Sequence, residues 1–504
     1  MGAALQQQIE EGRAAAAGLL RGERLGIGGV RRPVLPVSWL ALDSEIRRGP
    51  SPSPGSRGFD RIEVRLCHPD GRIREAALDA PRPPLPLVAI RCADWVPAVR
   101  DRARAVLADA LATRPADTLI ELTPLVLRLA GRERGVWARD LFAAALRAGD
   151  PVTAPWWRPA RPARWWRPAR AARTMTGEEP DTVLAWLRRS GDLPTRRFAA
   201  GLTLDAGLFG VRELARRAAE ERDPATARLW ADAALAAMAA EGPDDEAVDA
   251  LLGGHLPMVR AGGVTALRRA GRAAEAAGHL ADRSSLVRAC ARWLVRQHGG
   301  DPYAHCRALV EDPARVTPYA VAGFAECAKP ADAPLLRALL ERPGPGGDAV
   351  RAAAVAGLRA VGTSETALLR TLLDDPSPAV AREAARGLLP DAGGLPGDWL
   401  AARISPDRPP HTRRAAYRVL HARGGVDGLR ASVELLTDSD PVLRRVAAQR
   451  VQSLWSPERP PDLPVRDPEV GALLDRCTGL FSDHVMRRMR SRLGIPLGPS
   501  RPAG

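Results

Sequence analysis

The residues with the clearest potential for chemistry form a duplicated segment rich in tryptophan and arginine. Residues 156–164 read Trp-Trp-Arg-Pro-Ala-Arg-Pro-Ala-Arg, and residues 165–173 repeat them at eight of nine positions. The prolines disfavour an α-helix and favour a polyproline II helix, which has three residues per turn. The arginines recur at every third position, so they would share one edge about 46 Å long. These residues are Arg158, Arg161, Arg164, Arg167, Arg170 and Arg173, with Trp156, Trp157, Trp165 and Trp166 on the other edges.

The sequence leaves two interpretations of this duplication open. Arginine forms paired hydrogen bonds with phosphates, and tryptophan stacks on unpaired bases or lies at a lipid interface. The duplication is therefore a candidate contact for nucleic acid, an anionic membrane or an acidic partner. Alternatively, it is an accidental duplication that a surface loop tolerates. Lys329 is the single lysine, so 73 of the 74 basic residues are arginine, a skew typical of a GC-rich genome.

Other reactive residues do not predict a catalytic or metal site. Residues of metal-ligating type occur between positions 290 and 327, but their spacing does not resemble that of a tetrahedral zinc site. The adjacent Cys67 and His68 fall at a turn, where the histidine is expected to act as a cap. No glycine-rich phosphate loop is present, so we predict no cofactor and no metal, and we favour a non-enzymatic protein. The ligand-type residues are Cys290, His298, His305, Cys306 and Cys327.

The six cysteines are scattered and give no disulfide framework. The longest early apolar stretch, residues 14–20, is too short for a signal peptide or a membrane-spanning helix. These features predict a soluble, cytoplasmic protein.

A chain of 504 residues is too long for one hydrophobic core, so it forms either several domains or an array of repeats. A recurring sequence pattern favours the array. A turn containing Asp or Pro is followed by an apolar residue, and a small residue comes four positions later. From Thr195 to Leu443 this apolar anchor recurs at a mean interval of 31 residues, which is typical of two helices per unit. The anchors are Thr195, Ala227, Val259, Val287, Val316, Val350, Val380, Thr412 and Leu443.

One unit illustrates the expected packing. A first helix from Ser364 to Leu373 carries a leucine stripe and ends before Pro376, because proline cannot continue the hydrogen-bonded ladder. A second helix beginning near Pro378 places apolar residues on one side, and these are expected to be buried. They are Val380, Ala384, Ala385 and Leu388.

The motif D-x-x-x-x-V-R-x-x-A-x-x-x-L stands intact at residues 94–107 and nearly so at 282–295. It resembles the HEAT-repeat family, closest to its short bilin-lyase-type units, over most of residues 59–456. The resemblance implies an all-α fold, an α-solenoid of HEAT-like helical pairs with a period of about 31 residues. It also implies a structural Asp–Arg ladder between adjacent repeats, although Gly254 precedes Arg260 where an aspartate is expected. The ladder pairs are Asp94 and Arg100, Asp282 and Arg288, and Asp438 and Arg444.

Changes in composition divide the chain into predicted segments. These are an N-terminal helical segment (1–47), a flexible linker (48–58), a first HEAT-like block (59–150), the Trp/Arg/Pro-rich insert (151–180), a main HEAT-like block (181–456), and a proline-rich connector with a terminal helical cap and basic tail (457–504).

The resemblance implies a scaffold that binds a protein partner through the concave face of its second helices. A nucleic-acid-binding protein, including one like the HEAT-like DNA glycosylases, is the alternative that the net charge of +15 permits. A bilin-lyase-like enzyme also fits the repeat class, but no catalytic cysteine or acid pair supports it. The oligomeric state is not indicated.

Overall fold

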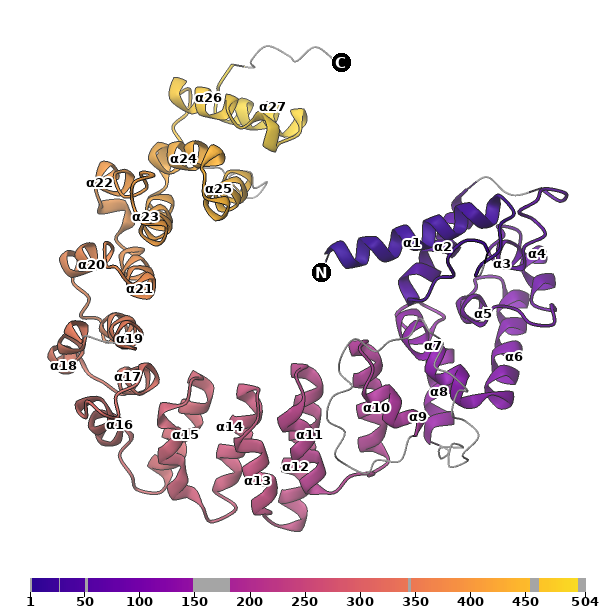
Figure 1. The fold of residues 1–504 in the computed structure, drawn as a ribbon, viewed down its shortest axis with the longest axis horizontal. Coiled ribbons are helices and arrows are strands. Elements are labelled where there is room, and N and C mark those ends of the chain that lie inside the picture. The colour runs from indigo at the N-terminus through magenta and orange to yellow at the C-terminus, as the bar shows by residue number, and fades with distance from the viewer. Residues whose placement is uncertain are drawn as a thin grey trace. The chain divides into compact units, whose positions relative to one another are not determined.

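The computed structural model describes residues 2–26, 28–49, 53–147, 182–342, 346–453 and 462–496. Within these ranges the chain is 70% helical and has no strand beyond an isolated bridge between Leu25 and Val30. The predicted all-α class is therefore confirmed (Figure 1). The chain divides into two compact units, Met1–Ala266 and Leu267–Gly504. This boundary falls inside the block predicted for residues 181–456.

The first unit is a series of helices in which successive members pair. The pairs α1–α2, α3–α4, α5–α6, α7–α8, α9–α10 and α11–α12 are each in contact. The bounds are α1 (Gly2–Leu20), α2 (Pro36–Arg48), α3 (Ile62–Leu66), α4 (Gly71–Ala77), α5 (Leu85–Arg91), α6 (Pro97–Thr113), α7 (Pro115–Leu129), α8 (Val136–Arg147), α9 (Val183–Arg188), α10 (Leu193–Asp205), α11 (Val211–Glu220), α12 (Pro224–Glu241), α13 (Asp245–Leu252) and α14 (Pro257–Leu267), the last of which ends at the unit boundary.

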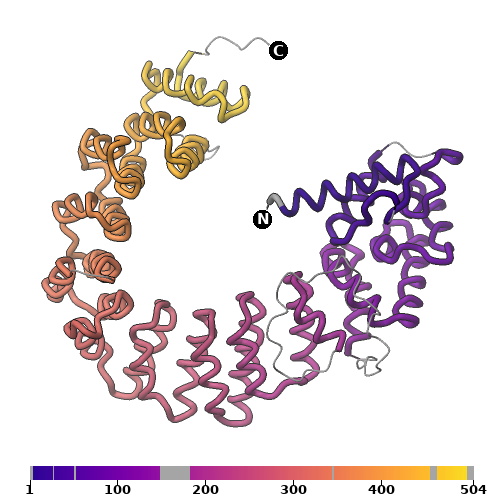
Figure 2. The backbone as a smooth tube through the Cα atoms, in the orientation of Figure 1, coloured from indigo at the N-terminus to yellow at the C-terminus, as the bar shows by residue number. Residues whose placement is uncertain are grey.

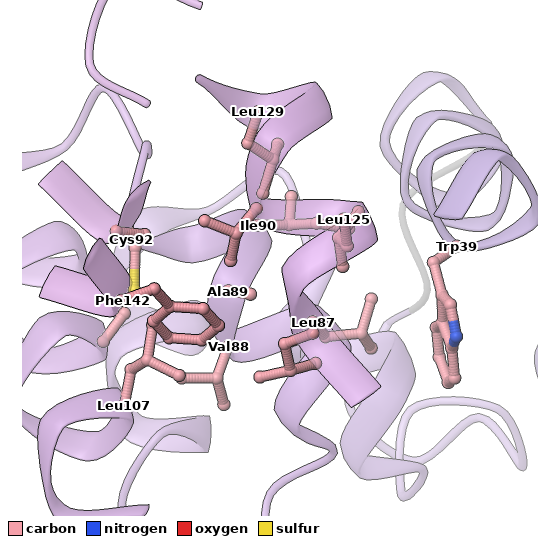
Figure 3. Packing of buried hydrophobic residues seen from close by; sticks show 14 of the residues in the cluster. Trp39, Leu87, Val88, Ala89, Ile90, Cys92, Leu107, Leu125, Leu129 and Phe142 are labelled. Atoms are coloured by element: carbon pink, nitrogen blue, oxygen red, sulfur yellow. The ribbon is translucent and has the colours of Figure 1, made fainter. Parts of the chain in front are cut away.

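The N-terminal helices share one hydrophobic core with the helices that follow them. Trp39 of α2 belongs to the same buried cluster as Leu87 of α5, Phe142 of α8 and Leu202 of α10. Figure 3 shows Phe142 among the leucine and valine side chains of this cluster. Burial of a large apolar side chain contributes about 1.5–3 kcal/mol to folding stability. Packing against α5, α8 and α10 in this shared core therefore stabilises α2.

The second unit repeats one helical hairpin several times. Each first helix contacts the second helix of its own hairpin, as in α16–α17, α18–α19, α20–α21, α22–α23 and α24–α25. The second helices α17, α19, α21 and α23 also contact one another in sequence order (Figure 2). The bounds are η2 (Ala273–Ala281), α15 (Ser285–Gln297), α16 (Pro302–Glu311), α17 (Pro318–Ala325), η3 (Pro330–Asp332), α18 (Ala333–Ala338), η4 (Leu339–Glu341), α19 (Gly347–Ala360), α20 (Thr366–Leu372), α21 (Pro378–Leu388), η5 (Ala392–Gly394), α22 (Gly397–Ala401), α23 (Pro410–Arg423), α24 (Gly425–Glu434), η6 (Leu435–Thr437), α25 (Pro441–Ser453), α26 (Pro468–Asp475), η7 (Thr478–Leu480) and α27 (Asp483–Arg492).

The second helices begin at the predicted spacing. From α10, which starts at residue 193, to α25, which starts at 441, the eight intervals average 31 residues. Most of these helices have proline in their first turn, where its missing N–H costs no hydrogen bond. One anchor was wrong: Val316 precedes α17, because that helix starts at Pro318 and its matching buried residue is Ala320.

The hairpin of α20 and α21 packs as its sequence pattern predicts on the second helix, and only in part on the first. Val380, Ala384, Ala385 and Leu388 are all buried, as expected. Of the leucine stripe on the first helix, Leu369 and Leu373 are buried, whereas Leu368 and Leu372 are partly exposed. The shorter helix, Thr366–Leu372, presents a narrower buried face than its sequence suggests.

Candidate functional site

The duplicated tryptophan and arginine segment, residues 156–173, lies outside the residues that the structure describes. The ladder residues are described, and each predicted arginine donates to a backbone oxygen rather than to the carboxylate of its aspartate. Arg100 donates to the carbonyl oxygen of Asp94 at 3.2 Å, and Arg288 donates to that of Asp282 at 2.7 Å. Arg444 donates in the same way to Asp438.

This contact recurs where the sequence has no aspartate. An arginine on the second helix of a hairpin donates to the carbonyl oxygen six residues earlier, in the turn before that helix, at 2.8 Å for Arg74 of α4 and at 3.0 Å for Arg260 of α14. The acceptor residues are His68 and Gly254, so the contact needs no side chain at that position. We call this arginine-to-carbonyl contact the rung.

The carboxylates of Asp94, Asp282 and Asp438 have other kinds of partner. Each accepts a hydrogen bond from the backbone N–H two residues later, at 3.0 Å in Asp94, 2.7 Å in Asp282 and 2.8 Å in Asp438. This bond fixes the turn before the helix. Two of them also bind an arginine of the preceding hairpin: Asp94 binds Arg74, and Asp438 binds Arg413.

The ion pair between Arg351 and Asp375 is another such link between hairpins, and Arg351 also pairs at 3.0 Å with Asp348 of its own helix. Its two hydrogen bonds measure 2.7 and 3.0 Å, and the Asp375 carboxylate is buried. A double-mutant cycle with alanine at both positions is expected to give a coupling energy of about 1–3 kcal/mol. The exposed pair of Arg337 and Glu365 is the control and should give less than about 1 kcal/mol. Equal coupling energies at the two pairs would contradict a structural role for the ion pair between Arg351 and Asp375.

A basic pocket lies where two hairpins of the first unit meet. Its cavity has a volume of about 240 Å³. Helix α9 contributes an arginine from its C-terminal end, α10 and α11 contribute one each, and the turn before α12 contributes a fourth. The lining residues are Arg188, Arg196, Arg217, Glu220, Glu221, Arg222, Thr226 and Trp230.

One aromatic ring contacts two of these guanidinium groups. The Arg188 and Arg217 guanidinium carbons lie 5.0 and 4.3 Å from the centre of the Phe209 ring. The Phe209 ring in turn lies 6.0 Å from that of Trp230, which is buried. A cation over an aromatic face is stabilised by the electron density of the ring. The Phe209 ring, packed against Trp230, therefore helps to position both arginines at the wall of the pocket.

Carboxylates satisfy part of the pocket's positive charge. Arg196 forms a 2.8 Å ion pair with Glu221, and Glu221 also accepts the backbone N–H groups of Arg222 and Asp223. The hydrogen bonds from Arg197 hold the pKa of the Asp223 carboxyl well below its usual range. The lining holds four arginines and two glutamates, and Arg217 also pairs at 2.7 Å with Glu213, which lies outside the lining. Guanidinium groups at such a site can pair with a carboxylate or phosphate group of a ligand.

The sequence analysis missed this pocket. Its arginines come from four separate segments, and in a chain with 73 arginines their positions carry no distinctive spacing. The only local signal is Phe209, an uncommon aromatic residue in the loop between α10 and α11.

The structure also places the residues considered as metal ligands. Among the described residues, no group of three or more His, Cys, Asp or Glu side chains could hold a metal ion. Cys306 is buried and Cys327 is partly exposed, and both are free cysteines. His68 accepts the backbone N–H of Asp70 through its Nδ1 atom at 3.0 Å, which confirms the predicted turn cap.

No helix within the described ranges is both long enough and apolar enough to cross a membrane. No protein-family model matches the chain, and no curated protein matches it.

Proposed function

We propose that the chain is a helical-repeat scaffold, an α-solenoid of HEAT-like hairpins, which binds a protein partner in the cytoplasm. The observation that carries this proposal is the serial contact of α17, α19, α21 and α23, each from a separate hairpin. Such contacts between neighbours build repeat arrays, and arrays present extended surfaces that suit extended partners. The motif at residues 94–107 supports the HEAT-like assignment.

The partner that fits this scaffold is an acidic protein segment. The net charge of +15 attracts acidic surfaces, and the pocket adds arginines that can pair with carboxylates. Arg222 is the lining arginine best suited to a test, because it is exposed and lies in the turn between α11 and α12. Its replacement should therefore change the charge of the pocket without disturbing the core.

Affinity purification of the tagged chain from its native cells tests this proposal. We expect a protein partner that remains bound after nuclease treatment. Arg222→Glu should reduce its recovery at least fivefold, corresponding to about 1 kcal/mol at a contact that a charge reversal makes repulsive. Arg228→Glu is the matched control, because Arg228 is an exposed arginine on neighbouring α12 that does not line the pocket.

Three outcomes separate the alternatives. Recovery of nucleic acid alone, lost on nuclease treatment, would replace the proposal with nucleic-acid binding. Equal loss in the Arg222 and Arg228 variants would show that only net charge matters and would remove the pocket from the interface. Recovery of a pigment or a modified protein would instead support lyase-like chemistry.

A further inference from the structure

Three arginine side chains converge on one carboxylate where two neighbouring second helices of the second unit meet. Helices α19 and α21 contact each other (Figure 1), and Glu383 lies on α21. Arg386 on α21 forms an ion pair with Glu383, and the Nε atom of Arg382 lies 3.8 Å from its Oε1 atom. A guanidinium nitrogen of Arg359 on α19 lies 3.5 Å from the Oε2 atom of Glu383. We call these three arginines with Glu383 the arginine cluster.

The charges of the arginine cluster do not balance. The three arginine side chains are 45–54% exposed, whereas the Glu383 side chain is buried, with 10% exposed. Within the part of the chain that the structure describes, no second carboxylate pairs with these arginines. Arginine stays protonated in proteins, so three positive charges and one negative charge leave a net charge of +2. This excess charge faces solvent.

The next second helix carries a balanced version of the same positions. Helix α21 begins at residue 378 and α23 at residue 410, so Arg414 corresponds to Arg382 and Ala415 to Glu383. Arg414 is 45% exposed and binds Asp440, whose side chain is 10% exposed, through hydrogen bonds of 2.9 and 3.0 Å. One arginine therefore faces one carboxylate at nearly the same exposure. The excess charge of the arginine cluster does not follow from its helical position alone.

The ligand that neutralises this excess is a group with two negative charges. A carboxylate brings one charge and would leave one arginine uncompensated. A phosphate monoester brings a charge of about −1.5 to −2 at pH 7, and its three oxygens accept hydrogen bonds from several guanidinium groups at once. A phosphodiester of nucleic acid carries only one charge per phosphate. Clustered arginines are a recurrent means of recognising phosphorylated side chains.

We propose that the arginine cluster binds the phosphate group of a phosphorylated serine or threonine in a protein partner. Glu383 positions the three guanidinium groups, and their exposed N–H groups donate to the phosphate oxygens. The inference rests on the proposed scaffold function for its protein partner, but it concerns a separate surface, because the basic pocket and the arginine cluster share no residue.

The test is calorimetric titration of the full-length chain at low salt with a blocked five-residue alanine peptide that has phosphoserine at its centre. The phosphoserine peptide should bind at least about tenfold more tightly than the same peptide with serine, because a phosphate adds one to three charge-assisted hydrogen bonds. It should also bind more tightly than the glutamate peptide, which brings one charge. Equal affinities for the phosphoserine and serine peptides would overturn the proposal. Tighter binding of a ten-nucleotide thymidine strand would replace it with nucleic-acid binding.

Three variants assign the binding to the arginine cluster. Arg382→Gln removes one positive charge and should weaken binding of the phosphoserine peptide about fivefold, as expected for one exposed ion pair. Glu383→Gln removes the internal counter-charge and should strengthen binding. Arg414→Gln is the matched control and should bind as wild type does. Equal weakening in Arg382→Gln and Arg414→Gln would overturn the assignment. Circular dichroism of each variant verifies that it is folded.

A capture experiment identifies the source of the phosphate. Tagged wild-type and Arg382→Gln chains are incubated with extracts of native cells, with and without phosphatase treatment. Recovery of a protein that falls both with phosphatase and in Arg382→Gln would support a phosphorylated partner. Recovery that neither change affects would overturn the phosphorylated partner but leave the scaffold proposal intact. Recovery of no protein would contradict the scaffold proposal, whereas the peptide titration would still decide whether the arginine cluster binds phosphate.

Discussion

Replacing Asp94 with alanine is expected to destabilise the first unit by about 3–5 kcal/mol, because it leaves buried arginines without their counter-charge. The Asp94 carboxylate is 1% exposed and binds Arg74 at 2.8 Å, Arg47 at 3.1 Å and Arg91 at 3.2 Å. The Arg74 side chain is fully buried. Asp43, which also binds Arg91, is the remaining carboxylate of this cluster. Denaturant unfolding followed by circular dichroism measures the change.

The exposed pair of Asp79 and Arg102 provides the control. Asp79→Ala should cost less than about 1 kcal/mol, because solvent screens an ion pair of which the aspartate is 61% exposed. If the denaturant midpoint of Asp94→Ala were close to that of Asp79→Ala, the buried charge cluster would not stabilise the first unit as proposed.

The contribution of Asp94 should also depend on pH. Burial raises its pKa, but the hydrogen bonds from Arg74 and the Val96 N–H, with the charge of Arg91, outweigh burial, and the net pKa is lowered. A lowered folded-state pKa gives stability that is fully present above the unfolded value, about 3.9, and is lost as the pH falls through the folded value. The difference in the free energy of unfolding between wild type and Asp94→Ala should therefore be constant near pH 7 and shrink below about pH 4.

Replacing Phe324 with alanine is expected to destabilise the second unit by about 3–5 kcal/mol. Phe324 lies on α17, is 0% exposed, and packs its ring 5.8 Å from that of Tyr303 on α16. Helix α17 also contacts α19, so the resulting cavity would weaken both the hairpin and its junction with the next one. The thermal midpoint and the denaturant midpoint should both fall.

Tyr319→Ala on the same helix is the matched control. Tyr319 is 49% exposed, so its loss should change stability by no more than about 0.5 kcal/mol. If both variants lost the same stability, helix propensity rather than core packing would explain the effect.

The positions of the second helices could be predicted because two physical signals agree. Proline marks the first turn of α21, and Val380, Ala384 and Leu388 repeat at the helical period. The anchor in α17 was misassigned because Val316 is the more apolar residue, whereas Pro318 determines where the helix begins. Hydrophobicity alone therefore gives the approximate position of a repeat. The position of its proline shows at which residue the second helix begins.

The contacts between hairpins could not be predicted in the same way. The sequence pairs Asp94 with Arg100 by spacing, but the carboxylate binds Arg74, whose proximity depends on how two hairpins pack. The basic pocket has the same origin, since Arg188 and Arg217 converge on Phe209 from separate helices. The role of the duplicated segment at 156–173 stays a prediction.

The rungs and ion pairs also bear on how the chain folds during synthesis. A rung joins residues only six apart, and several links between hairpins join residues 20 to 26 apart. These links are Arg74–Asp94, Arg351–Asp375, Arg413–Asp438 and Arg197–Asp223. Contacts this local carry a small loop-closure cost and favour rapid folding. Each hairpin could therefore dock on its predecessor soon after it leaves the ribosome, before the rest of the chain has been translated.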